Sequence, residues 1–447
     1  MQRISAWPAP SVLKGILVVI ALVAIGVGIQ EGIVVRDSLA GGNLGPVTDF
    51  DRWMIMTPRF LHEHVDYVDD NMPTAPLTLL VFAPFTAVSR PVAQLLWASF
   101  KLPLIIGVLL LSLALVKRAG GQLSGQALLL LGAAWWLPVM VDLQEGQVNF
   151  VALLPLVAAL VVAQGDTPRS DSIAGALIGL AAVVKVTPII FVAYFIWKRR
   201  WRVPVGALAG LVAGFFIVPA LAFGWSQNIR WLSQWTSIMI TPYVARGAVV
   251  YATTQSVGSF ALRALSHVPA FEVHRDGIKS YGYMNMAALS AAAIQQIVRG
   301  TMVAVALAGL FWMRRPLASL RSPRYVLEVA AVAAFMLWFS ERTWVHHYVS
   351  FVIPLAAAGM IVSDAHVPAT ARRFVFVALV IFACASLFAS DISRLLGRHG
   401  VEWAKAIGVF LWPSVLIVIG LVRVTLLRRQ PDDAAVHVAR RESRAVV

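Results

Sequence analysis

Charged residues and cysteine are scarce in this 447-residue chain, and each shortage excludes a class of protein. Only 13% of the residues are charged and 59% are hydrophobic, which leaves too few polar side chains to cover a soluble protein of this length. The single cysteine, Cys384, excludes an internal disulfide and a thiolate metal cluster. Because Cys384 lies in an apolar run, we expect a packed, inert thiol.

Apolar runs of about 20 residues, the length that crosses a bilayer, recur along the whole sequence. They predict an all-α polytopic integral membrane protein with about twelve transmembrane helices. The first run has no small-residue cleavage site and is expected to remain as an anchor. The predicted spans are 13–35, 74–90, 92–116, 124–140, 148–164, 173–197, 203–223, 297–313, 325–339, 345–362, 373–390 and 404–427.

The net charge of +15 predicts the orientation of the chain and no nucleic-acid partner, since Lys and Arg lie mostly at span ends. With the N-terminus in the cytoplasm, the basic clusters at 198–202, 314–324 and 372–373 all face the cytoplasm. Lys117-Arg118 and Arg169 then face outward, and placing them inside requires broken or re-entrant segments near Pro91 and Pro188.

Residues 1–430 are predicted to form one transmembrane domain, and 431–447 a disordered cytoplasmic tail. The two long outer loops, 36–73 and 224–296, are expected to form the binding or catalytic face. The first has the composition of an interfacial helix, and Trp225, Trp231 and Trp235 in the second favour headgroup depth. The polar stretch 266–286 predicts a flexible cap over a cleft.

Asp49 and Asp51 follow the first span at a spacing that suits either a divalent-cation site or a general base. The alternative is a pair of solvated loop acids. Two neighbouring carboxylates at a low-dielectric site are expected to differ in pKa, and therefore in role.

His346 and His347 begin a late span, and adjacent imidazoles point to different sides of one helix. A single histidine donating a hydrogen bond to an anionic oxygen is therefore favoured over a metal site, the alternative being interfacial histidines satisfied by water. Lys185 lies deep in its apolar segment and needs an anion beside it. That anion is either a substrate phosphate or carboxylate, or an acid or freed carbonyl near Pro188.

Two further polar groups are candidates for contacts with a substrate. Residues 144–149, Gln-Glu-Gly-Gln-Val-Asn, form a polar turn between apolar runs. Gln255, Ser256 and Arg263 on the second outer loop can contact hydroxyls and phosphate, or can be ordinary loop residues.

Taken in order, these segments resemble glycosyltransferase family 87, a family of membrane enzymes that includes polyprenol-phosphate-mannose-dependent mannosyltransferases and arabinofuranosyltransferases of actinobacterial envelopes. The residues that carry the resemblance are Asp49-Phe50, Pro73-Thr74-Ala75-Pro76-Leu77, Gly146-Gln147-Val148-Asn149, Lys185-Val186-Thr187-Pro188, Gln255-Ser256 and Trp344-Val345-His346-His347-Tyr348.

The resemblance implies a GT-C type architecture and inverting transfer of a sugar, with mannose favoured, from a polyprenyl-phosphate donor to a glycolipid or polysaccharide acceptor. Asp49 is then the expected general base and Asp51 its orienting partner. The donor phosphate is assigned to His346, His347, Arg342 and Lys185, and the sugar or acceptor to Gln147, Asn149, Gln255, Ser256 and Arg263.

The family implies no metal cofactor, although Mg or Mn at Asp49 and Asp51 stays open. It also implies a multi-pass protein of a bacterial cytoplasmic membrane, in contact with membrane lipids and with its active site on the outer side. A transporter or flippase of lipid-linked sugars is the alternative, because polar residues inside spans also mark transporters. The absence of paired halves favours the enzyme.

Overall fold

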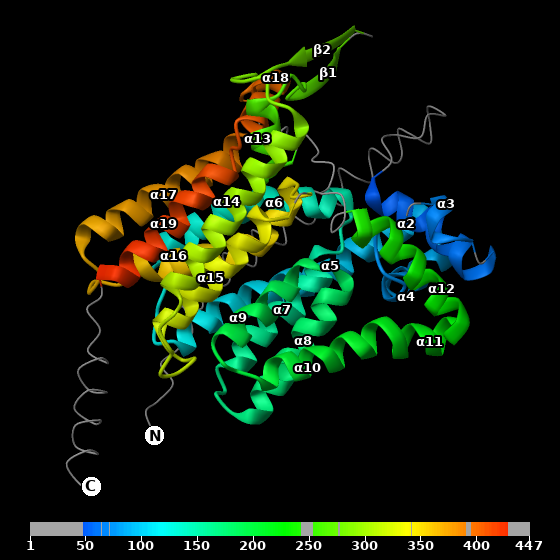
Figure 1. Ribbon diagram of the computed structural model, residues 1–447, viewed down its shortest axis with the longest axis horizontal. Coiled ribbons are helices and arrows are strands. Elements are labelled where there is room, and N and C mark those ends of the chain that lie inside the picture. The colour runs from blue at the N-terminus through cyan, green and yellow to red at the C-terminus, as the bar shows by residue number, and fades with distance from the viewer. Residues whose placement is uncertain are drawn as a thin grey trace.

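The computed structural model describes residues 48–63, 65–70, 72–242, 254–275, 278–340, 342–389 and 395–427. The predicted span 13–35 and the tail 431–447 lie outside these residues. The described chain forms a bundle of helices with one β-hairpin (Figure 1). Its elements are α2 (Asp49–Pro58), η1 (Arg59–Glu63), α3 (Tyr67–Asp70), α4 (Leu77–Phe82), η2 (Ala83–Ala87), α5 (Arg90–Arg118), α6 (Gly125–Glu145), α7 (Asn149–Ala163), α8 (Pro168–Val184), η3 (Thr187–Ile189), α9 (Ile190–Trp197), α10 (Arg202–Val212), η4 (Ala213–Ile217), α11 (Val218–Phe223), α12 (Trp225–Trp235), η5 (Thr236–Ile240), α13 (Val257–Leu265), β1 (Phe271–Arg275), β2 (Ile278–Gly282), α14 (Ala291–Trp312), α15 (Pro323–Trp338), η7 (Val345–Phe351), α16 (Val352–Ser363), α17 (Ala369–Phe388), α18 (Gly397–Ala406) and α19 (Leu411–Leu427).

Several helices have the length and composition of membrane spans, which confirms the predicted class. Among the described residues six helices qualify, and a seventh span results if α18 and α19, bent by 42°, are counted together. The six are Arg90–Arg118, Gly125–Glu145, Arg202–Phe223, Ala291–Trp312, Val345–Ser363 and Ala369–Phe388. The larger number of crossings predicted from the sequence is not confirmed, because predicted spans such as 74–90 and 148–164 correspond to helices shorter than a bilayer requires.

The predicted span 173–197 is wrong as a single crossing, because the chain reverses inside it. Arg200 follows α9, yet its guanidinium bonds Asp171 in the first turn of α8 at 3.0 Å and Asp166, just before α8, at 2.6 Å. One continuous helix would hold residues 29 positions apart about 43 Å away from each other. The segment is therefore a re-entrant hairpin whose turn begins at Lys185, as the alternative break near Pro188 predicted.

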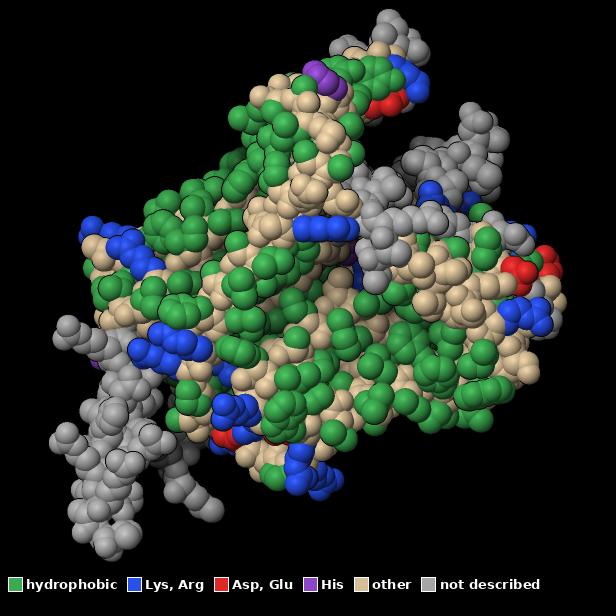
Figure 2. Space-filling model, in the orientation of Figure 1, with side chains coloured by type: hydrophobic (Ala, Val, Ile, Leu, Met, Phe, Trp, Pro, Cys, Tyr) green, Lys and Arg blue, Asp and Glu red, His purple; other side chains and the backbone are tan. Residues whose placement is uncertain are grey.

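This reversal brings the basic clusters to one end of the bundle. Arg118 donates to the Val161 carbonyl at 3.0 Å, and Arg321 donates to the Gln164 carbonyl at 2.8 Å. Lys198 donates to the Arg315 carbonyl at 2.9 Å. In Figure 2, lysine and arginine side chains gather at the lower left and lower edge, while hydrophobic side chains cover much of the middle. Lys117-Arg118 and Arg169 then lie at the same end as the other basic clusters, so they no longer conflict with the orientation predicted from the basic residues.

Small residues let α8 and α10 approach closely. A Cβ added to Gly175 would lie 2.0 Å from the Val203 carbonyl oxygen, and one added to Gly210 would lie 2.2 Å from the Ala176 carbonyl oxygen. Such contacts between backbones are typical of helix packing inside membranes, where apolar side chains gain little by leaving lipid. The packing fixes α8, and with it the position of Lys185.

At the opposite end of the bundle, α2, α3, α4 and α12 lie together, and α13, α18 and the β-hairpin form a separate projection (Figure 1). Trp231 and Trp235 are buried and donate to the Val65 and Pro73 carbonyls at 3.0 and 3.3 Å. Only Trp225 of the three tryptophans is exposed. Trp231 and Trp235 fasten α12 to the first outer loop, and the headgroup depth expected for the three rings stays a prediction.

Two other expectations are corrected by the structure. The described chain is not all-α, because the stretch 266–286 contains the antiparallel hairpin β1–β2, with Phe271 opposite Gly282; its role as a flexible cap stays a prediction. Phe271 packs edge-on against Trp403 of α18, with ring centroids 5.1 Å apart. Cys384 is exposed on α17 and so is not packed in the core.

Candidate active site

Asp49 and Asp51 lie in the first turn of α2, where they have different surroundings. Asp51 closes a capping box with Thr48, accepting from its backbone N–H at 3.0 Å and its hydroxyl at 2.9 Å. Arg90 at the start of α5 adds an ion pair to the same carboxylate at 2.6 Å. Asp51 is buried and its oxygens are occupied, so its geometry is that of a residue that orients α2.

Asp49 carries the accessible carboxylate of the pair. Its side chain is 37% exposed, and its only ion pair among the described residues is with Arg52 at 3.8 Å. The Gln147 amide donates a hydrogen bond to one Asp49 oxygen. Glu145, which the sequence analysis left unassigned, accepts a hydrogen bond from the Asp49 backbone. The polar turn 144–149 therefore holds the carboxylate of Asp49 in place.

A glycine makes this contact possible. Gly146 ends α6 in the left-handed conformation, with φ 65°, and a Cβ there would lie 2.3 Å from the Cβ of Phe50. The Gly146 carbonyl accepts from the indole N–H of Trp97 at 2.9 Å. The sequence Gly146-Gln147 thus brings α2 against the turn between α6 and α7.

A buried charged pair beneath this turn was missed by the sequence analysis. Lys101 of α5 and Asp142 of α6 form a fully buried ion pair. Asn149 donates to Asp142 at 2.7 Å and to the backbone carbonyl of His346 at 3.2 Å. A charge of each sign inside neighbouring spans was the available signal. The network joins three helices to the segment that carries the histidines.

We expect single substitutions in this pair to destabilise the protein strongly. Lys101→Met or Asp142→Leu leaves one buried charge unpaired, which costs about 3–5 kcal/mol of folding free energy. The double variant should lose much less, because both charges are removed. Thermal unfolding in nanodiscs checks this, with Lys405→Met as control, because its pair with Glu402 is partly exposed and is worth at most about 1 kcal/mol.

Lys185 follows α8 and lies near Asp49, Lys101, Asp142, His346 and His347, a group here called the cluster. Its ammonium makes no hydrogen bond or ion pair with any residue that the structure describes. The charges of Asp142, Asp49 and Lys101 act on it, and its own charge acts on both His346 and His347. Of the alternatives for its anion, a bound acid of the protein is therefore disfavoured in this structure.

The two histidines differ in their hydrogen bonds, although their rings are in contact and do not point to different sides of one helix as predicted. His347 accepts the Trp344 backbone N–H at 3.0 Å and also bonds the Arg342 backbone, so its ring stabilises its own turn. The His346 ring makes no hydrogen bond within the described part of the chain and meets His347 with centroids 4.4 Å apart. His346 is thus the better placed of the two to donate to a substrate.

The remaining predicted site residues support the histidine segment from outside. The Gln255 backbone bonds the Thr343 carbonyl at 2.6 Å and accepts the Tyr348 hydroxyl at 3.1 Å, while its side chain donates to the Lys405 carbonyl at 2.7 Å. Ser256 caps α13 by accepting from Ser259 N–H at 3.2 Å. Their visible contacts are structural, so direct contact with a sugar stays a prediction.

Arg263 and Arg342 are placed differently from each other. Arg263 is buried and donates to the Ala406 and Thr254 carbonyls at 2.8 Å each. Burial lowers the pKa of Arg263 to about 10, so the guanidinium stays protonated at neutral pH. Arg342 is partly buried just before the histidine segment, and its contact with a donor phosphate stays a prediction.

The cluster combines a held carboxylate, an imidazole and an ammonium without a direct partner among the described residues, at one end of a bundle with membrane-span helices. Such a combination suits an enzyme that takes a proton from one substrate and binds an anionic group of another. The chain belongs to glycosyltransferase family 87, whose sequence model matches residues 75–341. It is therefore a membrane glycosyltransferase. Asp49 and His346 lie outside the matched segment, so their roles are argued from geometry.

Three curated relatives have closely related functions. The chain is 25% identical to the polyprenol-phosphate-mannose-dependent alpha-(1-2)-phosphatidylinositol mannoside mannosyltransferase of Mycolicibacterium smegmatis, over 82% of this chain and 80% of the relative. It is 24% identical to the Mycobacterium tuberculosis protein of the same name, over 78% and 77%. A pentamannoside mannosyltransferase of M. smegmatis is 31% identical over 32% of each chain. No solved structure matches the chain.

Proposed function

We propose that this protein transfers mannose from a polyprenyl-phosphate donor to a glycolipid acceptor, with inversion at the anomeric carbon. The observation that carries the proposal is the grouping of the Asp49 carboxylate with the Lys185 ammonium, which has no direct partner in the part of the chain that the structure describes. Family membership supports glycosyl transfer, and the names of the relatives support the donor and a phosphatidylinositol mannoside type of acceptor. A polysaccharide acceptor is the second candidate.

The proposed step needs one base and one anion-stabilising group. Asp49 takes the proton of the acceptor hydroxyl, the hydroxyl oxygen forms a bond to the anomeric carbon, and the bond to the phosphate oxygen breaks. The polyprenyl phosphate leaves with the bonding electrons as a stable anion, so no general acid is required. Lys185 and His346 stabilise the developing charge, with Arg342 nearby. Gln147 and Asp51 position the base.

We place the site on the outer side of a bacterial cytoplasmic membrane. The basic clusters that the α8–α9 hairpin gathers at one end of the bundle favour the cytoplasm for that end. Arg90, which pairs with Asp51 in the first turn of α2, starts α5, whereas Arg118 ends the same helix. The candidate site is thus at the end opposite the basic clusters.

We predict that transfer does not require a divalent metal. The oxygens of Asp51 are bonded to Thr48 and Arg90, so Asp49 and Asp51 cannot both serve as cation ligands without breaking these bonds. Extensive EDTA treatment should leave the rate unchanged, and added Mg²⁺ or Mn²⁺ should not raise it. Loss of transfer with EDTA and recovery with one cation would show that the site is a metal site.

Product analysis tests the proposed function. Purified protein in nanodiscs receives synthetic polyprenyl-phosphate mannose and a panel of glycolipid and polysaccharide acceptors. Mass spectrometry identifies an added hexose, and NMR compares the anomeric configuration of donor and product. We expect a mannosylated glycolipid of opposite anomeric configuration. Retained configuration would overturn the direct displacement, and saturable lipid flipping without any transfer would support the transporter alternative.

A further inference from the structure

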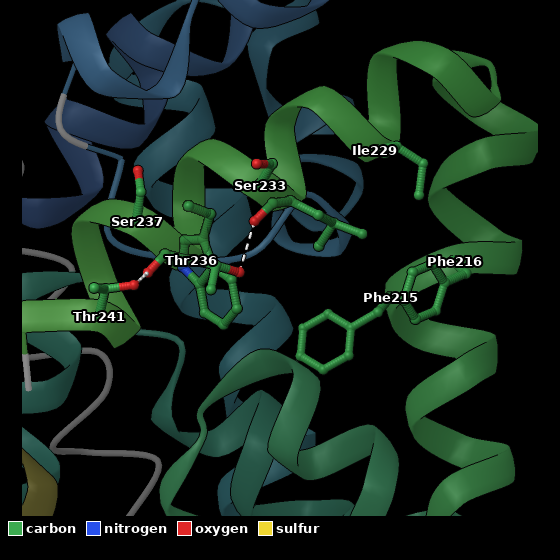
Figure 3. A pocket seen from close by; sticks show the side chains of 9 residues that line it. Phe215, Phe216, Ile229, Ser233, Thr236, Ser237 and Thr241 are labelled. Atoms are coloured by element: carbon green, nitrogen blue, oxygen red, sulfur yellow. Dashed lines mark hydrogen bonds between the residues drawn. The ribbon is translucent and has the colours of Figure 1, made fainter. Parts of the chain in front are cut away.

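A second feature near the candidate site is an apolar groove between two walls of the outer region, here named the η4–η5 groove. Phe215 and Phe216 of η4 form one wall, and Ile229, Leu232 and Trp235 of α12 form the other. Figure 3 shows the Phe215 and Phe216 rings projecting from one helix toward the gap, with Ile229 and Ser233 on the facing helix. The groove encloses about 570 Å³.

Both walls contain a turn of π-helix, an arrangement that frequently marks functional sites. In η4 the widened turn leaves carbonyls for other partners, and Asn228 of α12 donates to the Phe215 carbonyl at 2.9 Å. Asn228 is fully buried, so this bond fixes the spacing of the two walls. The groove is therefore built into the fold by a specific contact.

The groove is largely apolar, and three of the four hydroxyl groups that line it are bonded to backbone carbonyls. Thr236 donates to the Leu232 carbonyl at 2.7 Å, Ser237 donates to the Gln234 carbonyl at 2.7 Å, and Thr241 donates to the Thr236 carbonyl at 3.1 Å. Its η4 wall belongs to the span Arg202–Phe223, most of which is exposed on the bundle surface and thus available to lipid. An occupant therefore needs no polar groups and can enter from the membrane.

The side chains that pack beneath the groove connect it to the candidate active site. A Cβ on Gly214 would lie 2.7 Å from the Val183 side chain, so η4 packs directly on the end of α8 that precedes Lys185. Trp235, together with Phe215, belongs to the same apolar cluster as Phe50 and Val184. Phe50 directly follows Asp49 in the sequence, and Val184 directly precedes Lys185.

We propose that the η4–η5 groove holds the isoprenoid chain of the donor while Lys185 holds its phosphate. This inference rests on the proposed function and names the place where its donor lipid lies. In the donor, the phosphate is bonded to the sugar that moves, so it must lie in the same site as Asp49, across the anomeric carbon from the base. In a phosphatidylinositol mannoside, the lipid phosphate is separated from the reacting hydroxyl by intervening sugar rings. The apolar chain that continues from Lys185 is therefore that of the donor.

The test fills the groove and compares donors that differ only in chain length. Ser233 is exposed, lines the groove and makes no side-chain hydrogen bond in the described chain, so Ser233→Trp adds bulk without removing a contact. We expect it to raise KM for a long-chain donor by roughly tenfold or more, because apolar contact worth at least two methylene groups is excluded. KM for a short-chain donor and kcat for both donors should stay unchanged. Ser226→Trp, two turns earlier on α12 and outside the groove, is the matched control.

Three results would overturn the proposal. These are an unchanged KM for the long-chain donor, equal increases in KM for both donors, and an increase in KM for the acceptor alone. A photoreactive polyprenyl phosphate without sugar provides a measurement on the wild type that does not depend on turnover. It should label the peptide spanning 213–241, with competition by unlabelled polyprenyl phosphate, and labelling elsewhere would reject the groove. If the wild type transfers no sugar but is labelled there, the proposed function fails and the groove assignment stands.

Discussion

Asp49→Asn is expected to abolish sugar transfer while leaving donor binding intact. The amide keeps the size of the side chain and can still meet the Gln147 amide through its oxygen, but it cannot accept the acceptor's proton. Loss of a positioned general base lowers kcat by about 10²–10⁴-fold. Transfer rates in nanodiscs and equilibrium binding of the labelled donor, measured on the same preparation, check the two halves of this prediction.

The control for Asp49→Asn is the same change at the opposite end of the bundle. Asp166 is partly exposed and pairs with Arg200, so Asp166→Asn should alter neither transfer nor donor binding. Asp51→Asn should instead weaken the start of α2 and lower thermal stability, since Asp51 caps the helix and pairs with Arg90. Wild-type transfer by Asp49→Asn in a folded protein would rule out Asp49 as the base.

Lys185→Met is expected to impair donor binding and chemistry together. Methionine retains the apolar stem but removes the one ammonium in the cluster that has no direct partner in the described structure. Removing one group that stabilises a developing anion lowers kcat by about 10²–10³-fold, and KM for the donor should rise as well. Steady-state kinetics with varied donor, at saturating acceptor, separate the two effects.

Lys117→Met provides the matched control, because Lys117 lies in the last turn of α5 at the basic end of the bundle. It should leave both kinetic constants unchanged. If Lys185→Met kept the wild-type KM for the donor and the wild-type kcat, the phosphate would have to be bound elsewhere.

The class of protein and the main site residues could be predicted because their signals are local. Apolar runs mark spans, and acids, lysines or histidines inside or beside them are costly unless they have a function. The structure brings Asp49, Lys185 and His346 into one cluster, although nearly 300 positions separate the first from the last. Gly146-Gln147 also proved informative, since its turn holds the Asp49 carboxylate.

The sequence could not show which distant segments contact each other. The reversal at Lys185 depends on the contact of Arg200 with Asp171, and periodicity contains no information about it. Lys101 and Asp142 look like two isolated charges until α5 and α6 are side by side. Buried tryptophans such as Trp231 resemble interfacial ones in composition and differ only in their neighbours.

The same limit explains why some predicted substrate contacts have structural partners. A polar residue in an outer loop looks the same in the sequence whether its side chain faces a ligand or a backbone carbonyl. Gln255 and Arg263 hold the start of α13 and α13 itself against the end of α18, and Asn149 holds the His346 carbonyl. Their substitution should therefore affect stability before it affects specificity.

Chemical rescue of Asp49→Gly tests the central claim most directly, namely that the Asp49 carboxylate is the base beside a lysine-bound phosphate. The variant loses the carboxylate and leaves space for a small acid, so transfer is measured at increasing formate concentration. We predict negligible transfer without formate and a saturable recovery with it, absent when Lys185→Met is added. Wild-type transfer by Asp49→Gly without formate would contradict the account.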